Sequence, residues 1–141
     1  MHAAILDSTV YIDHWRGTLS EDALRQVQQT FIIRHSSVVL SELRRGARTR
    51  DAQGLVEGLF KLARIQWPPT SADWWEAGRL IRKIGNPRGW DPTRRLRFQN
   101  DVLIALTARR QGATIVTSNR ADFDLLAREI GVSVLPLNKP S

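Results

Sequence analysis

The pattern of apolar and polar positions predicts strands that alternate with helices along the chain. Short apolar runs predict strands at residues 2–6, 31–33, 36–39, 65–67, 113–117 and 132–135. Apolar residues at helical spacing predict helices at 20–29, from 41 onward, and at 51–64, 70–84, 98–110 and 121–130. The composition of residues 85–89, Gly-Asn-Pro-Arg-Gly, predicts a break in regular structure. This alternation favours a mostly parallel sheet with helices on both faces, so we expect an α/β fold built as a three-layer α/β/α sandwich.

The length and composition narrow the class of protein. With 141 residues, 42% hydrophobic and 25% charged, the chain suits one globular domain covering residues 1–141. No apolar run is long enough to span a bilayer, and the N-terminus lacks the pattern of a signal peptide. The absence of cysteine excludes disulfides and thiolate zinc sites. We therefore expect a cytoplasmic protein with no membrane partner.

The charge of the chain favours an anionic partner. The formal net charge is +7, and 18 of the 21 cationic side chains are arginine, which grips phosphate with a planar fork of donors. A genome rich in G and C explains the same arginine bias without any function. Two clusters stand out as candidate contacts to the phosphates of such an anionic partner, with solvated helix faces as the alternative. They comprise Arg44 and Arg45, followed by Arg48 and Arg50, and then Arg88, Arg94, Arg95 and Arg97.

Acidic residues lie where the predicted strands end and helices begin. Asp7 follows the first strand, and Asp122 follows the strand that ends at Thr117. Glu42 is placed at the start of a helix, and Asp101 on the first turns of the most buried helix. Sites in open parallel sheets lie beyond the carboxyl ends of the strands, so these acids are expected to meet there. A divalent cation would compensate several such acids at once, polarise a phosphate and activate water.

Each acid also has a purely structural interpretation. Asp7 can end a strand in a turn, and Glu42 can pair with Arg45 one turn along its helix. Asp101 can be an acid at a helix start, and Asp122 can cap the helix that follows it. The functional interpretation depends on the joint placement of the four acids.

Four sequence blocks resemble the motifs of PIN-domain nucleases, in the family's order and across nearly the whole chain. The blocks are Leu6-Asp7-Ser8-Thr9-Val10-Tyr11-Ile12, Ser37-Val38-Val39-Leu40-Ser41-Glu42-Leu43-Arg44-Arg45-Gly46, Asn100-Asp101-Val102-Leu103-Ile104-Ala105-Leu106-Thr107-Ala108 and Ile115-Val116-Thr117-Ser118-Asn119-Arg120-Ala121-Asp122-Phe123. The length and the Ser-Glu-Leu-Arg-Arg-Gly stretch are most similar to VapC-type toxins of bacterial toxin–antitoxin pairs.

The resemblance implies a metal-binding core and leaves its fourth position open. Asp7, Glu42 and Asp101 are implied as the ligands of Mg²⁺ or Mn²⁺. Many PIN domains carry an aspartate two residues after the threonine, whereas this chain has Asn119 there. Asp122 is the candidate for the fourth catalytic carboxylate, with Asn119 as a neighbour of the site. Thr9 and Thr117 are further neighbours that can orient water or a carboxylate, or simply satisfy backbone groups.

The resemblance implies a metal-dependent endoribonuclease, with RNA as substrate. It also implies a homodimer that a small antitoxin holds inactive by covering the acidic groove. The alternative is a PIN-like RNA-binding module that has lost catalysis, which the uncharged Asn119 favours. A phosphatase-like or receiver-like domain with Asp7 as nucleophile is a second alternative, but no lysine lies near a strand end to support a receiver.

Overall fold

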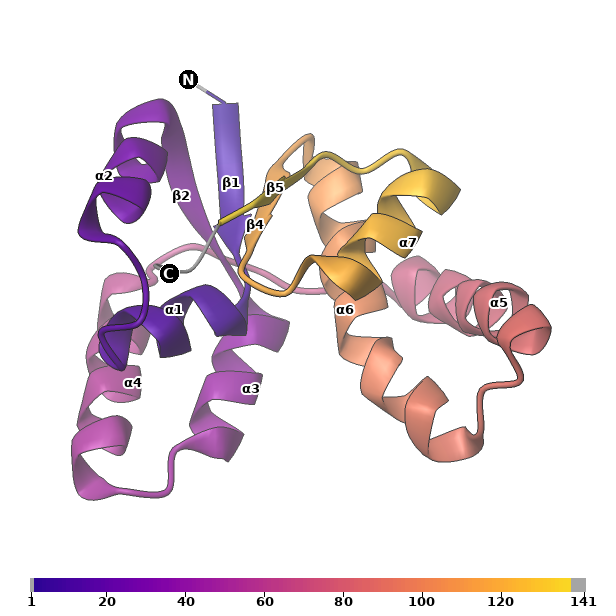
Figure 1. Cartoon of the computed structure of the whole chain (residues 1–141), viewed down its shortest axis with the longest axis horizontal. Helices are drawn as coiled ribbons and strands as arrows, with labels where there is room; N and C mark the ends of the chain where they lie inside the picture. The colour runs from indigo at the N-terminus through magenta and orange to yellow at the C-terminus, as the bar shows by residue number, and fades with distance from the viewer. Residues whose placement is uncertain (1, 138–141) are drawn as a thin grey trace.

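The computed structural model of the chain describes residues 2–137 as strands and helices that alternate (Figure 1). The strands are β1 (His2–Leu6), β2 (Phe31–Ser36), β3 (Gln66–Trp67), β4 (Thr114–Thr117) and β5 (Val134–Pro136). The helices are α1 (Ser8–Trp15), α2 (Glu21–Thr30), α3 (Ser37–Gly46), α4 (Arg50–Leu62), α5 (Ser71–Arg88), α6 (Pro92–Gln111) and α7 (Arg120–Ile130). No helix within residues 2–137 has the length and apolar character needed to cross a membrane.

The strands form one sheet in the order β3-β2-β1-β4-β5, and every pair is parallel. Because β1 is central, its carboxyl end lies between those of β2 and β4. Register places Leu6 beside Val116, so Asp7 and Thr117 leave neighbouring strands at the same edge of the sheet. The predicted parallel α/β sheet is confirmed.

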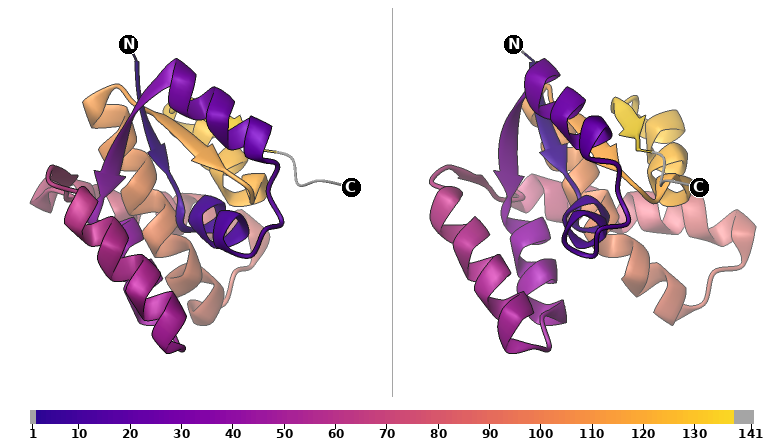
Figure 2. Two further views of the ribbon diagram at one scale, coloured as in Figure 1. Left: turned by 90° about the vertical axis from the view of Figure 1, so that its left-hand side faces the viewer. Right: turned by 60° about the vertical axis from the view of Figure 1, so that its left-hand side comes forward.

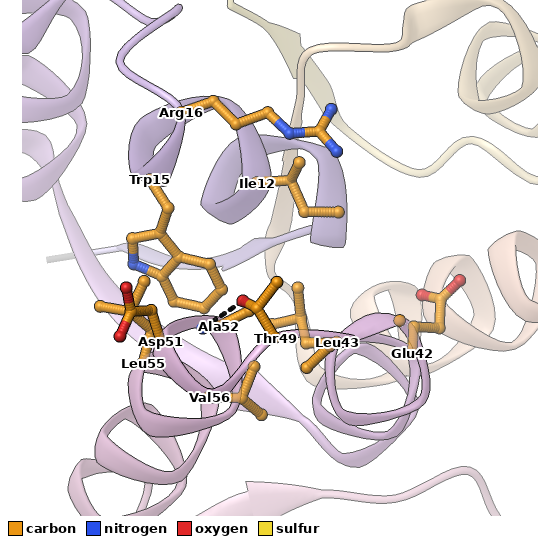
Figure 3. Close-up of a pocket in the computed structure, with 12 residues that line it drawn as sticks. Ile12, Trp15, Arg16, Glu42, Leu43, Thr49, Asp51, Ala52, Leu55 and Val56 are labelled. Carbon is orange, nitrogen blue, oxygen red and sulfur yellow. Dashed lines mark hydrogen bonds between the residues drawn. The ribbon is translucent and has the colours of Figure 1, made fainter.

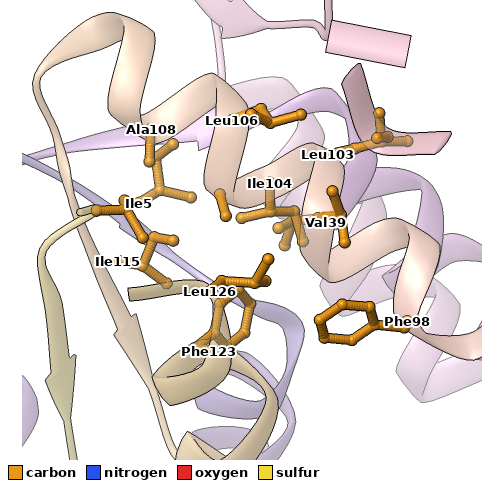
Figure 4. Packing of buried hydrophobic residues seen from close by; sticks show 14 of the residues in the cluster. Ile5, Val39, Phe98, Leu103, Ile104, Leu106, Ala108, Ile115, Phe123 and Leu126 are labelled. Atoms are coloured by element: carbon orange, nitrogen blue, oxygen red, sulfur yellow. The ribbon is translucent and has the colours of Figure 1, made fainter. Parts of the chain in front are cut away.

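Helices cover both faces of the sheet, as Figure 2 shows from two further directions. On one face, Ile5 and Ile115 pack against buried side chains of α3, α5, α6 and α7, and Figure 4 shows this packing around Phe123 and Leu126. On the other face, Ala4, Leu6 and Val116 pack against α1 and α2. Ile5 packs on one face of the sheet, and its neighbours Ala4 and Leu6 pack on the other, as expected for a strand that is buried on both faces. The three-layer α/β/α sandwich is therefore confirmed.

The structure differs from the sequence-based expectation at four helices, α1, α3, α5 and α6. Residues 8–15 form α1, for which the pattern gave no signal. Residues 36–39 were expected to be extended, but α3 begins at Ser37 because the Ser36 hydroxyl accepts from the amides of Val38 and Val39. This cap outweighs the β-preference of the two valines. Glu42 consequently lies six residues into α3, and not at its start.

The expected break at residues 85–89 is wrong, since α5 continues through Pro87 to Arg88. Pro87 lies one residue before the helix end, where it removes one amide donor from the last turn, and Gly89 closes the helix in the left-handed conformation. The next helix then begins at Pro92, six residues earlier than predicted, because the Asp91 carboxylate accepts from the amide of Arg94. Asp101 is therefore the tenth residue of α6, and not an acid of its first turns.

Candidate active site

Asp7 is a buried carboxylate at the junction of β1 and α1. It is the N-cap of α1, and its side chain is only 4% exposed. One carboxylate oxygen, Oδ1, accepts from the Thr9 hydroxyl at 2.5 Å and from the Val10 amide at 3.3 Å. The other, Oδ2, accepts from the Thr117 hydroxyl at 2.7 Å. Burial raises the pKa of Asp7, and these hydrogen bonds oppose that rise.

Thr9 and Thr117 tie the ends of β1 and β4 together around this carboxylate. The Thr9 hydroxyl also accepts from the amide of Ser118 at 3.1 Å, and Thr117 accepts from the amide of Asn119 at 3.0 Å. Every donor that reaches Asp7 is neutral. The two threonines therefore fix the position of the carboxylate while leaving its charge uncompensated.

Asp101 lies at the centre of the acidic group. The pKa of Asp101 is raised to about 8, chiefly by burial and then by the negative charges of Asp122, Glu42 and Asp7, in that order, while Arg94 lowers it. Four acids from four separate segments thus interact electrostatically at one edge of the sheet, as the sequence predicts. The interpretation of Asp101 as an acid at a helix start is wrong, because the residue sits in mid-helix.

Glu42 approaches the group from α3 and bonds to a residue that the sequence analysis passed over. Burial raises the pKa of Glu42, a side-chain hydrogen bond from Asn100 lowers it, Asp7 raises it and Arg45 lowers it. No ion pair joins Glu42 to Arg45 within the described part of the chain. Asn100 directly precedes Asp101 in α6. The same helix therefore carries both the Asp101 carboxylate and the amide that bonds Glu42.

At the fourth position the structure separates Asp122 from Asn119. Asp122 lies in the first turn of α7, and its Oδ1 accepts from the Arg94 guanidinium at 2.6 Å. Asn119 is the N-cap of α7, is exposed, and makes no side-chain capping bond. The interpretation of Asp122 as the cap of α7 is wrong, because the N-cap position belongs to Asn119. Of the two residues, Asp122 is the one whose charge acts on Asp101.

The candidate RNA-binding arginines occupy different environments. Arg45 is exposed one turn after Glu42, whereas Arg44 points to the opposite side of α3, where it lines a hollow with Leu40 and Phe60. Arg97 is exposed one turn before Asp101. The other three have partners inside the fold: Arg88 bonds the carbonyl of Ile84, Arg94 bonds Asp122, and Arg95 bonds the carbonyl of Trp90 and the Asn86 side chain.

A pocket of about 320 Å³ opens beside Glu42, between α1, α3 and α4 (Figure 3). Its walls are mostly apolar and include Ile12, Trp15 and Leu43. Arg16, at the end of α1, lines the same pocket, and Figure 3 shows its side chain on the α1 side, beside Ile12. The sequence analysis missed Arg16 because nothing in the order of residues places the end of α1 near Glu42.

The donor chemistry fits a hard divalent cation. All four acids present oxygen ligands, which Mg²⁺ and Mn²⁺ prefer. The negative charges of three of them raise the pKa of Asp101, an effect that a bound cation would oppose. As the side chains stand in residues 2–137, no three carboxylate or imidazole groups converge tightly enough to form a complete ligand set. Mg²⁺ usually binds through one or two carboxylates and keeps several waters, so the arrangement is compatible with a hydrated ion.

Comparison with known proteins agrees with this geometry. The family model of the PIN domain matches residues 4–129. No curated protein sequence matches the chain at a significant level.

Three similar solved structures are toxin–antitoxin complexes. VapBC2 from Rickettsia felis, bound to a DNA fragment from its promoter, has a TM-score of 0.68 at 20% identity, covering 96% of this chain and 99% of that one. DNA-bound VapBC from Salmonella typhimurium has a TM-score of 0.66 at 20% identity, covering 96% and 98%. VapBC-5 from Mycobacterium tuberculosis has a TM-score of 0.58 at 23% identity, covering 98% and 99%. These likenesses show a shared fold, and the family match covers most of the chain. The chain therefore belongs to the PIN domain family, whose members are generally nucleases.

Proposed function

We propose that the protein is a metal-dependent endoribonuclease that hydrolyses RNA phosphodiester bonds. The observation that carries the proposal is that Asp7, Glu42 and Asp122, from three other segments of a PIN domain, lie near enough to Asp101 for their charges to raise its pKa. Nothing in the fold requires four interacting acids there, and their mutual repulsion opposes stability. Such a cost is expected where carboxylates hold a cation for chemistry.

Asp7, Glu42 and Asp101 are the proposed ligands of Mg²⁺ or Mn²⁺, and Asp122 is the fourth catalytic carboxylate. Thr9 and Thr117 hold Asp7 in place, and Asn100 holds Glu42. A bound divalent cation supplies polarisation of the phosphate and a lowered pKa for an attacking water. The carboxylates also orient that water by accepting its hydrogen bonds.

The substrate is proposed to be RNA, held at the rim of the acidic group by arginines whose side chains make no hydrogen bond or ion pair within residues 2–137. Arg45 and Arg97 lie one helical turn from Glu42 and Asp101, and Arg16 lines the pocket beside Glu42. Trp15 in the wall of that pocket offers an apolar surface against which a base can pack. These cations are placed to balance the phosphate charges that the acids repel.

The rival function, an RNA-binding module without catalysis, loses its main support in this geometry. It rested on the missing charge of Asn119, but Asp122 brings a negative charge next to Asp101. The acidic group therefore has as many carboxylates as the catalytic hypothesis needs.

The partners are proposed by analogy with the similar structures, which are VapBC toxin–antitoxin complexes. We propose that a small antitoxin covers the acidic groove and holds the enzyme inactive, and that the protein forms a homodimer. Trp75 on α5 is 87% exposed, and an exposed tryptophan of this kind supports a protein contact. A short adjacent reading frame whose product stops cleavage at equimolar ratio would support the toxin hypothesis.

The test of the activity is metal-dependent cleavage of total RNA by the purified chain. We expect cleavage with Mg²⁺ or Mn²⁺, none after EDTA, recovery with excess metal, and no turnover with Ca²⁺, whose loose shell orients water poorly. Asp101→Asn, purified in the same way, is the control for contaminating nucleases. Undiminished cleavage in EDTA would contradict the proposal.

A further inference from the structure

The segment between α5 and α6 is built around the side chain of Trp90. The Trp90 amide bonds the Gly85 carbonyl at 3.1 Å, and its own carbonyl accepts from Arg95 Nε at 2.8 Å. The ring meets Phe98 edge-on, with centroids 5.0 Å apart. A Cβ on Gly85 would lie 3.3 Å from both the Trp90 ring and the Arg95 guanidinium, so a larger residue there would push these groups by a few tenths of an ångström. The Trp90 ring is therefore fixed on several sides.

Arg94 lies on the face of this fixed ring. Its guanidinium carbon is 4.0 Å from the Trp90 ring centroid, and its terminal nitrogen donates to Asp122 Oδ1 at 2.6 Å. A planar guanidinium can stack on an aromatic face and bond a carboxylate at its edge at the same time, which an ammonium cannot do in that geometry. The two contacts together fix where the Asp122 carboxylate stands.

We propose that Arg94 is a positioning residue, which holds the Asp122 carboxylate beside Asp101 so that its second oxygen is available to the metal site. The inference rests on the proposed function and adds a role that phosphate binding would not supply. Arg94 precedes Asp101 by seven residues, which is two turns of α6, so both side chains lie on one face of the helix. Helix α6 thereby carries both Asp101, a proposed metal ligand, and Arg94, which directs the Asp122 carboxylate toward the same site.

The charge of Arg94 and its position have opposite consequences for metal binding. As a cation near the site, Arg94 repels a divalent ion, so its removal would tighten metal binding if charge alone mattered. As a positioning residue, it keeps Asp122 in place, so its removal weakens metal binding. Loss of such a supporting partner commonly lowers the metal affinity of a site by roughly ten- to a hundredfold. We expect a loss of about tenfold here.

The experiment is a calorimetric titration of the full chain with Mn²⁺, without RNA, at one pH and ionic strength. Arg94→Ala is expected to raise the Mn²⁺ dissociation constant about tenfold. Arg109→Ala is the matched control, because Arg109 is an exposed arginine of the same helix in its last turn. We expect Arg109→Ala to bind Mn²⁺ as the unaltered chain does. Adding Arg94→Ala to Asp122→Asn is expected to weaken binding no further, because the two residues act as one unit.

A thermal melt of each variant separates positioning from folding. Arg94→Lys keeps the charge and gives a second measurement if Arg94→Ala does not fold; its affinity is expected to lie below that of the unaltered chain. Folded Arg94→Ala that binds Mn²⁺ as tightly as the unaltered chain, or more tightly, would overturn the positioning role. If only Arg94→Lys folds, unchanged affinity in that variant overturns it. If the unaltered chain binds no Mn²⁺, the proposed function fails, and the inference fails with it.

Discussion

The two sides of the acidic group hold their carboxylates by different means. On the β1–β4 side, neutral hydroxyls and one amide hold Asp7, deep in the protein. On the α6–α7 side, a guanidinium stacked on Trp90 holds Asp122, nearer the surface. Neutral donors fix a carboxylate without reducing its pull on a cation, whereas a cationic donor fixes it and reduces the net negative charge. We expect a site built from both to hold its carboxylates in place for the proposed metal ion.

The largest loss of RNA cleavage is expected when a proposed metal ligand is removed from either side of the acidic group. Asp7→Asn and Asp101→Asn each remove a proposed ligand, one from each side, and Glu42→Gln removes the third. We expect each variant to lose RNA cleavage about a hundredfold or more. Stability should hold or rise, because the remaining acids repel one another less. Initial rates and melting temperatures measure the two effects, and wild-type activity in two of the three variants would refute the site.

The second effect concerns stability against pH without metal. The pKa of Asp101 is raised from 3.8 to about 8, so between these values the folded protein holds a proton that the unfolded chain has released. The resulting stabilisation is complete below about pH 4 and is lost as pH rises through about 8. Melting temperature in EDTA should therefore decline across this window. The decline should be shallower in Asp101→Asn, and an equal decline in both proteins would show that other groups cause it.

The third effect, on stability and cleavage, tests only the β1–β4 side, where neutral groups hold Asp7. Thr117→Val removes the hydroxyl that donates to Asp7 Oδ2 and accepts from the Asn119 amide. We expect a loss of about 1–3 kcal/mol in the free energy of unfolding and a lower rate of cleavage. Thr114→Val is the control on the same strand, since Thr114 bonds only Ser133 at the far end of β4. Equal cleavage by the two variants would argue against a role for Thr117 in placing Asp7.

The smallest effect concerns RNA affinity at two places on the rim of the acidic group, one beside Glu42 and one beside Asp101. Arg45→Ala, beside Glu42, and Arg97→Ala, beside Asp101, should each reduce the slope of log affinity against log salt by about 1. Arg44→Ala changes the same charge on the opposite side of α3 and should change the slope less. Filter binding with Asp101→Asn as background prevents cleavage during the measurement. Equal slopes for Arg44→Ala and Arg45→Ala would show that net charge, and not position, controls binding.

Sequence patterns predicted the layers and the sheet well, because apolar runs flanked by turn residues record burial directly. They failed where one polar residue decides a helix boundary. Ser36 and Asp91 begin α3 and α6 by capping, against the pattern of the residues around them. The sequence did contain a signal for α6, since Asp91-Pro92 is a common helix start.

For the candidate site, the sequence predicted which acids share one edge of the sheet, because strand ends and motif order mark them. It did not predict their partners. The bonds between Asn100 and Glu42 and between Arg94 and Asp122 depend on how α6 packs against α3 and α7. No local pattern encodes that packing. The same applies to Arg16, which shares a pocket with Glu42 although 26 positions separate them.

The hydrogen bond between Thr117 and Asp7 spans 110 positions, and β1 lacks its neighbour β4 until that strand is made. A chain grows from its N-terminus, so Asp7 has Thr9 and Val10 as partners early but gains Thr117 only after most of the sequence has been made. Pairing over such a separation also slows folding. A nascent chain cut short before residue 114 would hold Asp7, Glu42 and Asp101 without the strand that fixes them. The proposed nuclease activity would thus arise only once nearly the whole chain has been made, so incomplete translation products would leave RNA around the ribosome uncut.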